Sequence, residues 1–250
     1  MNGHPLLEAR GVTVRFGGLV AVDQVSAAFA PGELVGIIGP NGAGKTTFFN
    51  ALSGVIEPSA GELFAAGARL TGARPHRFAQ QGIARTFQTP RVFAELSVAA
   101  NIGFGLQFAG RQRTASWLLK DETSILNLIG LAAQAGLPAA AITPSQQRLL
   151  EIGMALATRP RLLLLDEVAA GLTESEIESM AQLIRRLRDD LDLTVIWIEH
   201  AVTTLLRHVE RVLVLHQGRK IADGTPAEVV RNAEVVEAYL GDEMVEGVTV

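Results

Sequence analysis

The sequence contains no cysteine among its 250 residues, which excludes disulfide bonds and cysteine-ligated metal sites. This composition fits a reducing compartment without requiring one. The sequence also lacks an uncharged apolar run of about eighteen residues, the length that could cross a membrane. Near the N-terminus, Glu8 and Arg10 stand where a signal peptide would need an apolar core. We therefore expect any role at a membrane to depend on partner subunits.

The sequence also lacks an excess of positive charge. Its net charge is −4, and acidic and basic residues are scattered along the chain, so no patch predicts binding to nucleic acid. Hydrophobic residues make up 48% of the chain, which is typical of a globular protein and excludes a disordered one. At this length we expect one compact domain that includes a subdomain.

The segment Gly39–Thr46 (GPNGAGKT) fits the pattern G-x-x-x-x-G-K-[ST], which predicts a loop that wraps the phosphates of a nucleoside triphosphate. An apolar strand over 34–38 precedes it, and a helix is predicted to follow over 47–52. Glycines let phosphate oxygens approach backbone N–H groups, and the helix N-terminus adds positive partial charge. Lys45 would reach the β- and γ-phosphates, and the Thr46 hydroxyl would face Mg²⁺. The alternative is a glycine-rich turn that binds nothing. The predicted nucleotide-binding residues here are Gly39, Pro40, Asn41, Gly42, Ala43, Gly44, Lys45, Thr46 and Thr47.

A second candidate element is the apolar run 161–165, which ends in Asp166-Glu167. Such a run suits a central parallel strand that is covered on both faces. In phosphate-loop proteins an Asp at a strand end holds Mg²⁺, directly or through water, and a second carboxylate beside it can polarise the attacking water. The alternative is that the two acids only end a strand or begin a turn.

The order of the predicted elements indicates an α/β protein. Short strands are expected over 6–38, with turns at Gly17-Gly18 and Pro31-Gly32, and around 61–69. Residues 96–158 are predicted to be mostly helical, and a helix is expected over 175–191. Strands are expected at 194–198 and around Gln217-Gly218, followed by one terminal helix over 226–240. Alternation of strands and helices predicts an α/β core, and the helix-rich middle predicts an inserted subdomain.

With Phe16, Gly39–Thr46, Gln88, Thr143–Gln147, Asp166-Glu167 and His200 in this order, the chain resembles the ATP-binding subunit of an ABC transporter. Within that family it is similar to the ATPases of branched-chain amino acid importers, through Gly82–Gln88, Pro90–Phe93, Leu96, Gln146–Ile152, Ala169–Leu172, Ile198–His200 and Val236–Gly241. The resemblance implies a single ABC ATP-binding domain over 1–250. A phosphate-loop core with a short antiparallel β subdomain would occupy 1–95 and 159–250, and a helical subdomain 96–158.

The resemblance assigns roles to single residues. Phe16 would stack on adenine, although an ordinary core Phe at a strand end is the alternative. Gln88 would touch Mg²⁺ or water and report to the transmembrane partner, which would meet the segment 89–99. His200 would contact the γ-phosphate and hold the attacking water. Glu167 would act as general base. The implied catalytic residues are Lys45, Gln88, Glu167 and His200, and the implied Mg²⁺ ligands are Thr46, Gln88 and Asp166.

The segment Ile142–Gln146 departs from the family's usual Leu-Ser-Gly-Gly-Gln signature, because both glycines are lost. The residues still predict a helix start, with Thr143 as N-cap, Pro144 at the first position and Gln146 completing a capping box. In the family this helix points at ATP bound on the opposite subunit of a dimer, which makes Thr143, Ser145 and Gln146 candidate nucleotide contacts. Pro144 has no N–H to donate, and Ser145 adds a side chain where glycine would let phosphate come closest. An ordinary helix start is the alternative.

The function that follows is that of an ATPase which binds ATP and Mg²⁺ and powers an importer, for branched-chain or related amino acids. Its partners would be a second ABC ATPase subunit, in a homo- or heterodimer, the transmembrane permease subunits and, indirectly, a solute-binding protein. It would lie peripherally on the cytoplasmic face of the inner (plasma) membrane. One alternative is a soluble ABC ATPase of translation or DNA repair, although the chain has one cassette and no heptad run. Another is a small-molecule kinase or GTPase, but no Asn-Lys-x-Asp guanine motif is present.

Overall fold

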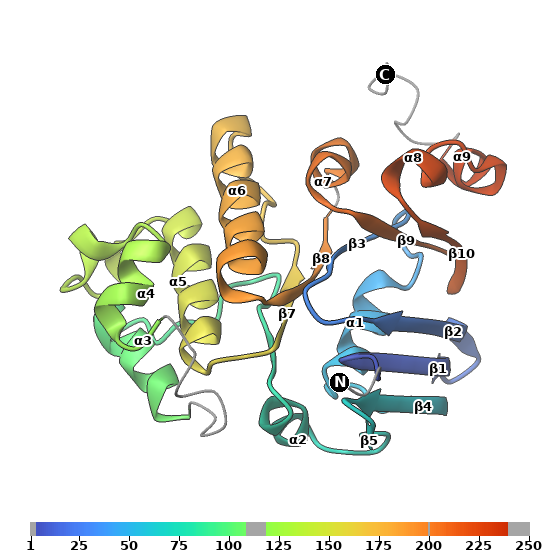
Figure 1. Ribbon diagram of the computed structural model, residues 1–250, viewed down its shortest axis with the longest axis horizontal. Helices are drawn as coiled ribbons and strands as arrows, with labels where there is room; N and C mark the ends of the chain where they lie inside the picture. The colour runs from blue at the N-terminus through green and yellow to red at the C-terminus, as the bar shows by residue number, and fades with distance from the viewer. Residues whose placement is uncertain (1–3, 109–118, 200, 240–250) are drawn as a thin grey trace.

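A computed structural model describes residues 4–108, 119–199 and 201–239, which form two sheets flanked by helices (Figure 1). The first sheet is antiparallel, with the strand order β2-β1-β4-β5. Its strands are β1 Leu7–Phe16, β2 Leu19–Phe29, β4 Ala60–Ala65 and β5 Ala68–Arg69. The expected turn at Gly17-Gly18 joins β1 to β2, and Gly17 takes the positive φ of 59° that this turn requires.

The second sheet has the order β10-β9-β3-β8-β7-β6 and is parallel except for its edge strand β10. Its strands are β3 Leu34–Ile38, β6 Ile83–Arg85, β7 Leu162–Asp166, β8 Thr194–Ile198, β9 Arg211–His216 and β10 Arg219–Gly224. Every residue of β3, β7 and β8 is buried. Their continuous apolar sequences follow from this burial, since helices or a second sheet cover both faces.

The helices are α1 Lys45–Leu52, α2 Pro75–Gln80, α3 Val98–Gln107, α4 Glu122–Leu128, α5 Pro144–Ala157, α6 Glu174–Leu191, α7 Val202–His208, α8 Pro226–Val229 and α9 Ala233–Tyr239. The predicted helices at 47–52 and 175–191 are confirmed, with starts at Lys45 and Glu174. The single terminal helix over 226–240 is wrong, because two short helices stand there. Thr225 caps α8, and the Asn232 side chain accepts N–H bonds from Glu234 and Val235 at the start of α9.

The core consists of two apolar clusters, one on each face of the parallel sheet. Alternate strand residues separate them: Leu163 and Leu165 belong to one, Leu162 and Leu164 to the other. The first cluster joins the sheet to α3–α6, and the second joins it to α1 and the antiparallel sheet. Helices α3, α4 and α5 lie together at one end of the molecule, away from the antiparallel sheet (Figure 1).

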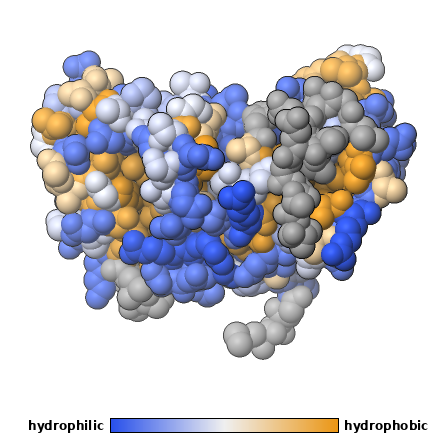
Figure 2. All heavy atoms as spheres, turned by 90° about the horizontal axis from the view of Figure 1, so that it is seen from above, coloured by the Kyte–Doolittle hydropathy of each residue, from blue (hydrophilic) through white to orange (hydrophobic). Residues whose placement is uncertain are grey.

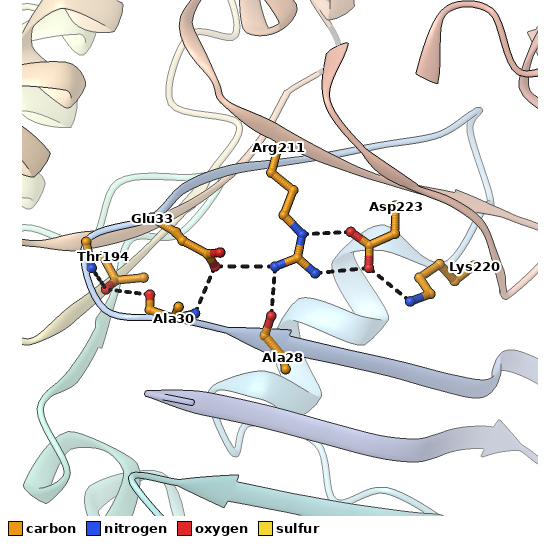
Figure 3. A network of polar contacts seen from close by, with 8 residues as sticks. Ala28, Ala30, Glu33, Thr194, Arg211, Lys220 and Asp223 are labelled. Carbon is orange, nitrogen blue, oxygen red and sulfur yellow. Dashed lines mark hydrogen bonds and ion pairs between the residues drawn. The ribbon is translucent and has the colours of Figure 1, made fainter. Parts of the chain in front are cut away.

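A network of charged and hydroxyl groups fastens the amino ends of three neighbouring parallel strands (Figure 3). Arg211, at the start of β9, donates two hydrogen bonds to Asp223 at 2.7 and 3.0 Å, and it contacts Glu33 at 3.3 Å. Thr194, the first residue of β8, accepts the Gly32 N–H at 2.9 Å. The Asp223 pKa is lowered because bonds from Arg211 and Lys220 outweigh its burial, which acts in the other direction. This network binds the loop before β3 to β8, β9 and β10.

Among the described residues, no helix combines the length and the apolar character that crossing a bilayer would need.

Candidate functional site

The loop between β3 and α1 occupies the carboxyl edge of the parallel sheet, where open α/β sheets place their ligands. Gly39, Gly42 and Gly44 take φ values of 155°, 76° and 97°. A Cβ at Gly39 would lie 2.1 Å from the Leu215 carbonyl oxygen, and one at Gly44 would lie 2.3 Å from that of Ala21. A Cβ at Gly42 would meet nothing within 4 Å. Two glycines therefore let the loop pack against both sheets, while Gly42 keeps its outer side open.

Lys45, the first residue of α1, turns its side chain back over this loop. Its ammonium donates to the carbonyl oxygens of Gly39 at 2.6 Å and Pro40 at 3.1 Å. Burial lowers the Lys45 pKa, and the nearby Glu167 carboxylate partly offsets this. The lysine is thus a buried positive charge held by two backbone carbonyl oxygens. It stands at the N-terminus of a helix whose first N–H groups have no acceptors within the helix.

A cavity of 530 Å³ opens beside the loop. Its lining comes from both sheets and includes Phe16, Leu19, Val20, Ala21, Asn41, Gly42, Ala43, Gly44, Lys45, Thr46, Thr47, Glu167, Gln217 and Gly218. Phe16 ends β1 and is 50% exposed, so its ring belongs to the rim of this cavity and not to the core. The exposure of this side chain contradicts the alternative of an ordinary core Phe.

Gly218, in the turn between β9 and β10, joins the loop to the rest of the cavity wall. Its N–H donates to the Ala43 carbonyl at 3.0 Å, and its own carbonyl accepts the Asp23 N–H at 2.8 Å. It takes a φ of 79°, and a Cβ would lie 3.0 Å from the Ala21 oxygen. The sequence predicted this turn but did not indicate that it touches the phosphate loop.

Asp166 is the last residue of β7 and is 3% exposed. Its carboxylate pairs with the Arg85 guanidinium at 3.0 Å, and Arg85 also donates to Asn50 and Ser53 at 2.8 Å each. Burial lowers the Arg85 pKa, and Asp166 opposes that effect. Sequence reasoning missed Arg85, for which no local signal exists because its partners lie far away along the chain.

Glu167 directly follows β7 and is 5% exposed. Its backbone takes a φ of 51°, a left-handed conformation that is uncommon for a residue with a side chain. Its carboxylate accepts a hydrogen bond from the Gln88 amide nitrogen at 2.7 Å. The structure thus brings Gln88, predicted from the family resemblance alone, into contact with the carboxylate predicted from the strand end.

Thr143, Ser145 and Gln146 lie away from this cavity. The predicted capping box at the start of α5 is confirmed: Thr143 accepts the Gln146 N–H at 3.3 Å, and Gln146 accepts the Thr143 N–H at 3.0 Å. The Ser145 hydroxyl lies 3.0 Å from that of Thr143. Hydrogen bonds from the Thr173 backbone and side chain, with a smaller contribution from Ser145, lower the pKa of Glu176. These residues line a second cavity, of 590 Å³, between α5 and α6. The chain does not itself bring its signature segment to its phosphate loop.

His200 lies outside the described residues. The residue before it, Glu199, is buried at 3% exposure and accepts the Ala169 N–H at 2.6 Å and the Trp197 indole N–H at 3.1 Å. Another residue that sequence reasoning missed is Glu151 on α5, whose carboxylate accepts N–H bonds from Phe87 and Arg91. A single acid inside an amphipathic helix gave no signal of this contact.

Within residues 4–108, 119–199 and 201–239, no three His, Asp or Glu side chains gather in a way that could hold a metal ion by themselves. Of the predicted Mg²⁺ ligands, Thr46 lines the cavity beside the loop, Asp166 ends β7, and Gln88 contacts Glu167, which also lines the cavity. Such a mixed set fits Mg²⁺, which usually takes one or two protein carboxylates and completes its shell with substrate phosphates and water. The donor chemistry is therefore compatible with a magnesium nucleotide.

A protein-family model described as "ABC transporter" matches residues 22–170, more than half of the chain. The chain belongs to the ABC transporter family. A second model, described as "Branched-chain amino acid ATP-binding cassette transporter", matches residues 219–245. As a member of the family the chain binds nucleotide, and its activity is ATP hydrolysis that powers transport. The predicted fold and ATPase activity are confirmed.

Curated relatives of this ABC protein span nearly its whole length. The high-affinity branched-chain amino acid transport ATP-binding proteins BraF of Pseudomonas aeruginosa and LivG of Escherichia coli K12 are each 37% identical, over 95% of this chain and 98% of their own. Among solved structures, the ADP conformation of MJ1267, an ATP-binding cassette of an ABC transporter, is 28% identical with a TM-score of 0.82, over 95% of this chain and 99% of that one. These relatives are transport proteins, which favours transport over the alternative of translation or DNA repair.

Proposed function

We propose that ATP hydrolysis by this chain drives uptake of branched-chain or related amino acids. The observation that carries the hydrolytic part is the 2.7 Å hydrogen bond from Gln88 to Glu167 on the wall of the cavity that Lys45 and Thr46 also line. The substrate class rests on the printed names of BraF and LivG and on the family model over 219–245. No described residue of this chain needs to touch the solute.

The phosphates of ATP would lie in the loop 39–46, against its backbone N–H groups and the N-terminus of α1. Lys45 would exchange its bonds to the Gly39 and Pro40 carbonyls for the β- and γ-phosphate oxygens. Adenine would stack on Phe16, and the exposure of this ring at the cavity rim supports that role. Thr46, Gln88 and Asp166 would hold Mg²⁺, whose chemistry is to neutralise charge on the transferring phosphoryl group.

Glu167 would take the proton of the water that attacks the γ-phosphorus, while the bond to the β–γ bridging oxygen breaks and ADP leaves. Gln88 would orient this carboxylate and the water through the amide contact described above. His200 would hold the water in line. Lys45 would stabilise the charge on the transferring group, since a buried cation acts strongly there.

Partner subunits would complete the transporter. This chain would bind peripherally to them at the cytoplasmic face of the inner membrane. Three aromatic rings contact one another in turn: Phe93 and Phe104 edge to face at a centroid distance of 4.7 Å, and Phe104 and Phe108 tilted at 5.2 Å. They are 42%, 40% and 66% exposed, in the order Phe93, Phe104 and Phe108. Apolar surface is visible over the end of the molecule formed by α3, α4 and α5 (Figure 2). Exposed aromatic clusters mark interaction sites, so this surface, with segment 89–99, would meet the permease subunits, and a solute-binding protein would act through them.

A second ABC ATPase subunit would supply the other half of the site. The start of α5 is a poor phosphate ligand, because Pro144 has no N–H and the Thr143 and Ser145 hydroxyls are already engaged with each other, Gln146 and Glu176. The working dimer would then be asymmetric, with hydrolysis at this chain's loop supported by a partner that has a complete signature. If the purified chain alone hydrolyses ATP as fast as the mixed dimer, this asymmetry is wrong.

The test is uptake by cells that lack this chain's gene. Labelled leucine, isoleucine and valine uptake should fall, and wild-type protein should restore it while the Glu167→Gln variant should not. Restoration by that variant would refute the ATPase role of Glu167. Unchanged uptake of all three amino acids on deletion would refute the substrate class.

A further inference from the structure

Glu151 is an acidic residue buried inside the apolar packing of α5. Its side chain is 6% exposed, and helix neighbours Leu150 and Ile152 are fully buried. A carboxylate in such a place destabilises the protein unless hydrogen bonds compensate for the lost water. Its two oxygens accept the backbone N–H of Phe87 at 3.3 Å and of Arg91 at 3.0 Å. Glu151 therefore binds α5 to the segment that follows β6.

That segment leads directly to the hydrolytic site. Gln88 lies between the two held residues and donates to Glu167 at 2.7 Å. The Phe87 ring is stacked by two guanidinium groups, that of Arg91 at 3.9 Å and that of Arg85 at 4.5 Å. Arg85 in turn pairs with Asp166 at 3.0 Å. Moving the Phe87 and Arg91 backbone would consequently move the groups that orient both acids of the site.

The same helix holds the segment on the other side of Glu167. Arg148, three residues before Glu151, donates to the Val168 carbonyl at 3.2 Å and also to that of Ala170. The N-cap of the helix, Thr143, lies about 12 Å along its axis from Glu151 at 1.5 Å per residue. A rigid helix thus connects the signature segment to both stretches of backbone around Glu167.

We propose that Glu151 is a positioning residue that transmits the position of α5 to Gln88, and through Gln88 to Glu167. This inference rests on the proposed hydrolytic role of Glu167. Movement of α5, whose start would face the partner's nucleotide, would shift the N–H groups that Glu151 holds. Gln88 would then approach or leave Glu167, so that turnover depends on how α5 is docked.

The first test is Glu151→Gln in the assembled transporter. Glutamine fills the same space, but it has one acceptor oxygen and turns an NH₂ group toward the second N–H, so one of the two bonds is lost. We expect kcat for ATP to fall about tenfold, since small misplacements of catalytic groups are costly, with KM unchanged. Glu210→Gln is the matched control, because the exposed Glu210 side chain pairs with Arg188. This variant should leave both constants unchanged.

The decisive test is a double-mutant cycle with Gln88→Ala. If Glu151 acts through Gln88, adding Glu151→Gln to Gln88→Ala should lower kcat no further. Multiplying effects, or unchanged kcat in the single variant, would overturn the proposal. Should Glu151→Gln fail to fold, Glu151→Asp, which keeps the charge on a shorter stem, replaces it in the same cycle. Loss of turnover in Gln88→Ala and Glu167→Gln, without loss in Glu151→Gln, would refute this inference alone and leave the proposed function standing.

Discussion

The two ends of the parallel sheet both carry arginine–carboxylate pairs, yet these differ in burial and in what they hold. At the amino ends, Arg211 and Asp223 form a two-bond pair with side chains 26% and 18% exposed. At the carboxyl ends, Arg85 and Asp166 share one bond at 10% and 4% exposure, next to Gln88 and Glu167. The Arg211–Asp223 pair joins strands, whereas the Arg85–Asp166 pair adjoins Gln88 and Glu167, and Glu167 lines the cavity. The difference agrees with the proposal that the amino end stabilises the fold and the carboxyl end supports the reaction.

The largest expected effect lies at the carboxyl end. Glu167→Gln removes the proposed general base, and steady-state phosphate release by the assembled transporter should fall about 10²- to 10⁴-fold. ATP should still bind, because Lys45 and the loop are unchanged, and the ATP-bound dimer should accumulate. Glu174→Gln, an exposed acid at the start of α6, is the control and should retain full turnover. Unchanged turnover in Glu167→Gln would remove this residue as the base.

The next effect is the pH dependence of stability, which should differ in sign between Glu151, bonded to the segment after β6, and Asp223, at the amino end of the sheet. Burial raises the pKa of Glu151 to about 7 from an ordinary value of 4.5, against the opposing effect of the Arg91 and Phe87 N–H groups and the Arg91 and Arg85 charges. The folded state therefore keeps this proton between pH 4.5 and 7 after the unfolded chain has lost it, so the stability that this group contributes is lost as pH rises. The change amounts to about 3 kcal/mol.

Denaturant unfolding at pH 5 and at pH 7.5 measures this slope. Glu151→Gln should remove it, so that the variant gains stability relative to the wild type as pH rises. Asp223 should show the opposite trend, with stability that falls as pH falls. Its pKa is lowered in the folded state, so the stability that it contributes is present above pH 3.8 and is lost as pH falls below that value. Equal slopes in wild type and Glu151→Gln would contradict the assignment.

Lys45→Ala should weaken nucleotide binding about 10- to 100-fold, because a hydrogen bond to a charged group contributes about 1.5–3 kcal/mol. Titration with a fluorescent ATP analogue measures it. Arg219→Ala is a control, since this surface cation, paired with Asp23, lies next to the Gly218 turn and outside the cavity lining. Equal affinity in Lys45→Ala and the wild type would show that phosphates do not reach the loop.

The smallest effect lies at the amino end. Arg211→Gln should lower the free energy of unfolding by about 1 kcal/mol, the usual size for a partly exposed ion pair. Nucleotide affinity and kcat should remain as in the wild type, since the network of Figure 3 lies at the opposite edge of the sheet from the loop. A thermal melt together with an ATPase assay distinguishes the two outcomes. If Arg211→Gln lost kcat without losing stability, the amino end of the sheet would also support the reaction, and the proposed difference between the two ends would be wrong.

Local patterns predicted those parts of the site that depend on neighbouring residues. Glycine spacing gave the loop at 39–46, and Thr143 with Gln146 gave the helix start, because both depend on contacts within a few positions. Contacts across the sheet were not predictable in this way. Arg85–Asp166 and Gln88–Glu167 join residues 81 and 79 positions apart, and both depend on the register of β6 against β7. The single terminal helix over 226–240 is wrong because the Asn232 side chain caps the start of a second helix inside that range.

The turn at Gln217-Gly218 has a practical consequence for observing this protein at work. Gly218 is held by backbone hydrogen bonds to both the phosphate loop and β2. Gln217 is exposed, lines the cavity proposed to bind nucleotide and already occupies a left-handed conformation with φ 49°. Because the chain contains no cysteine, a cysteine introduced at 217 would be its sole thiol. A fluorophore attached there would lie at the opening of the cavity, on a turn held by the backbone bonds of Gly218. Its emission would then report nucleotide binding and release in real time.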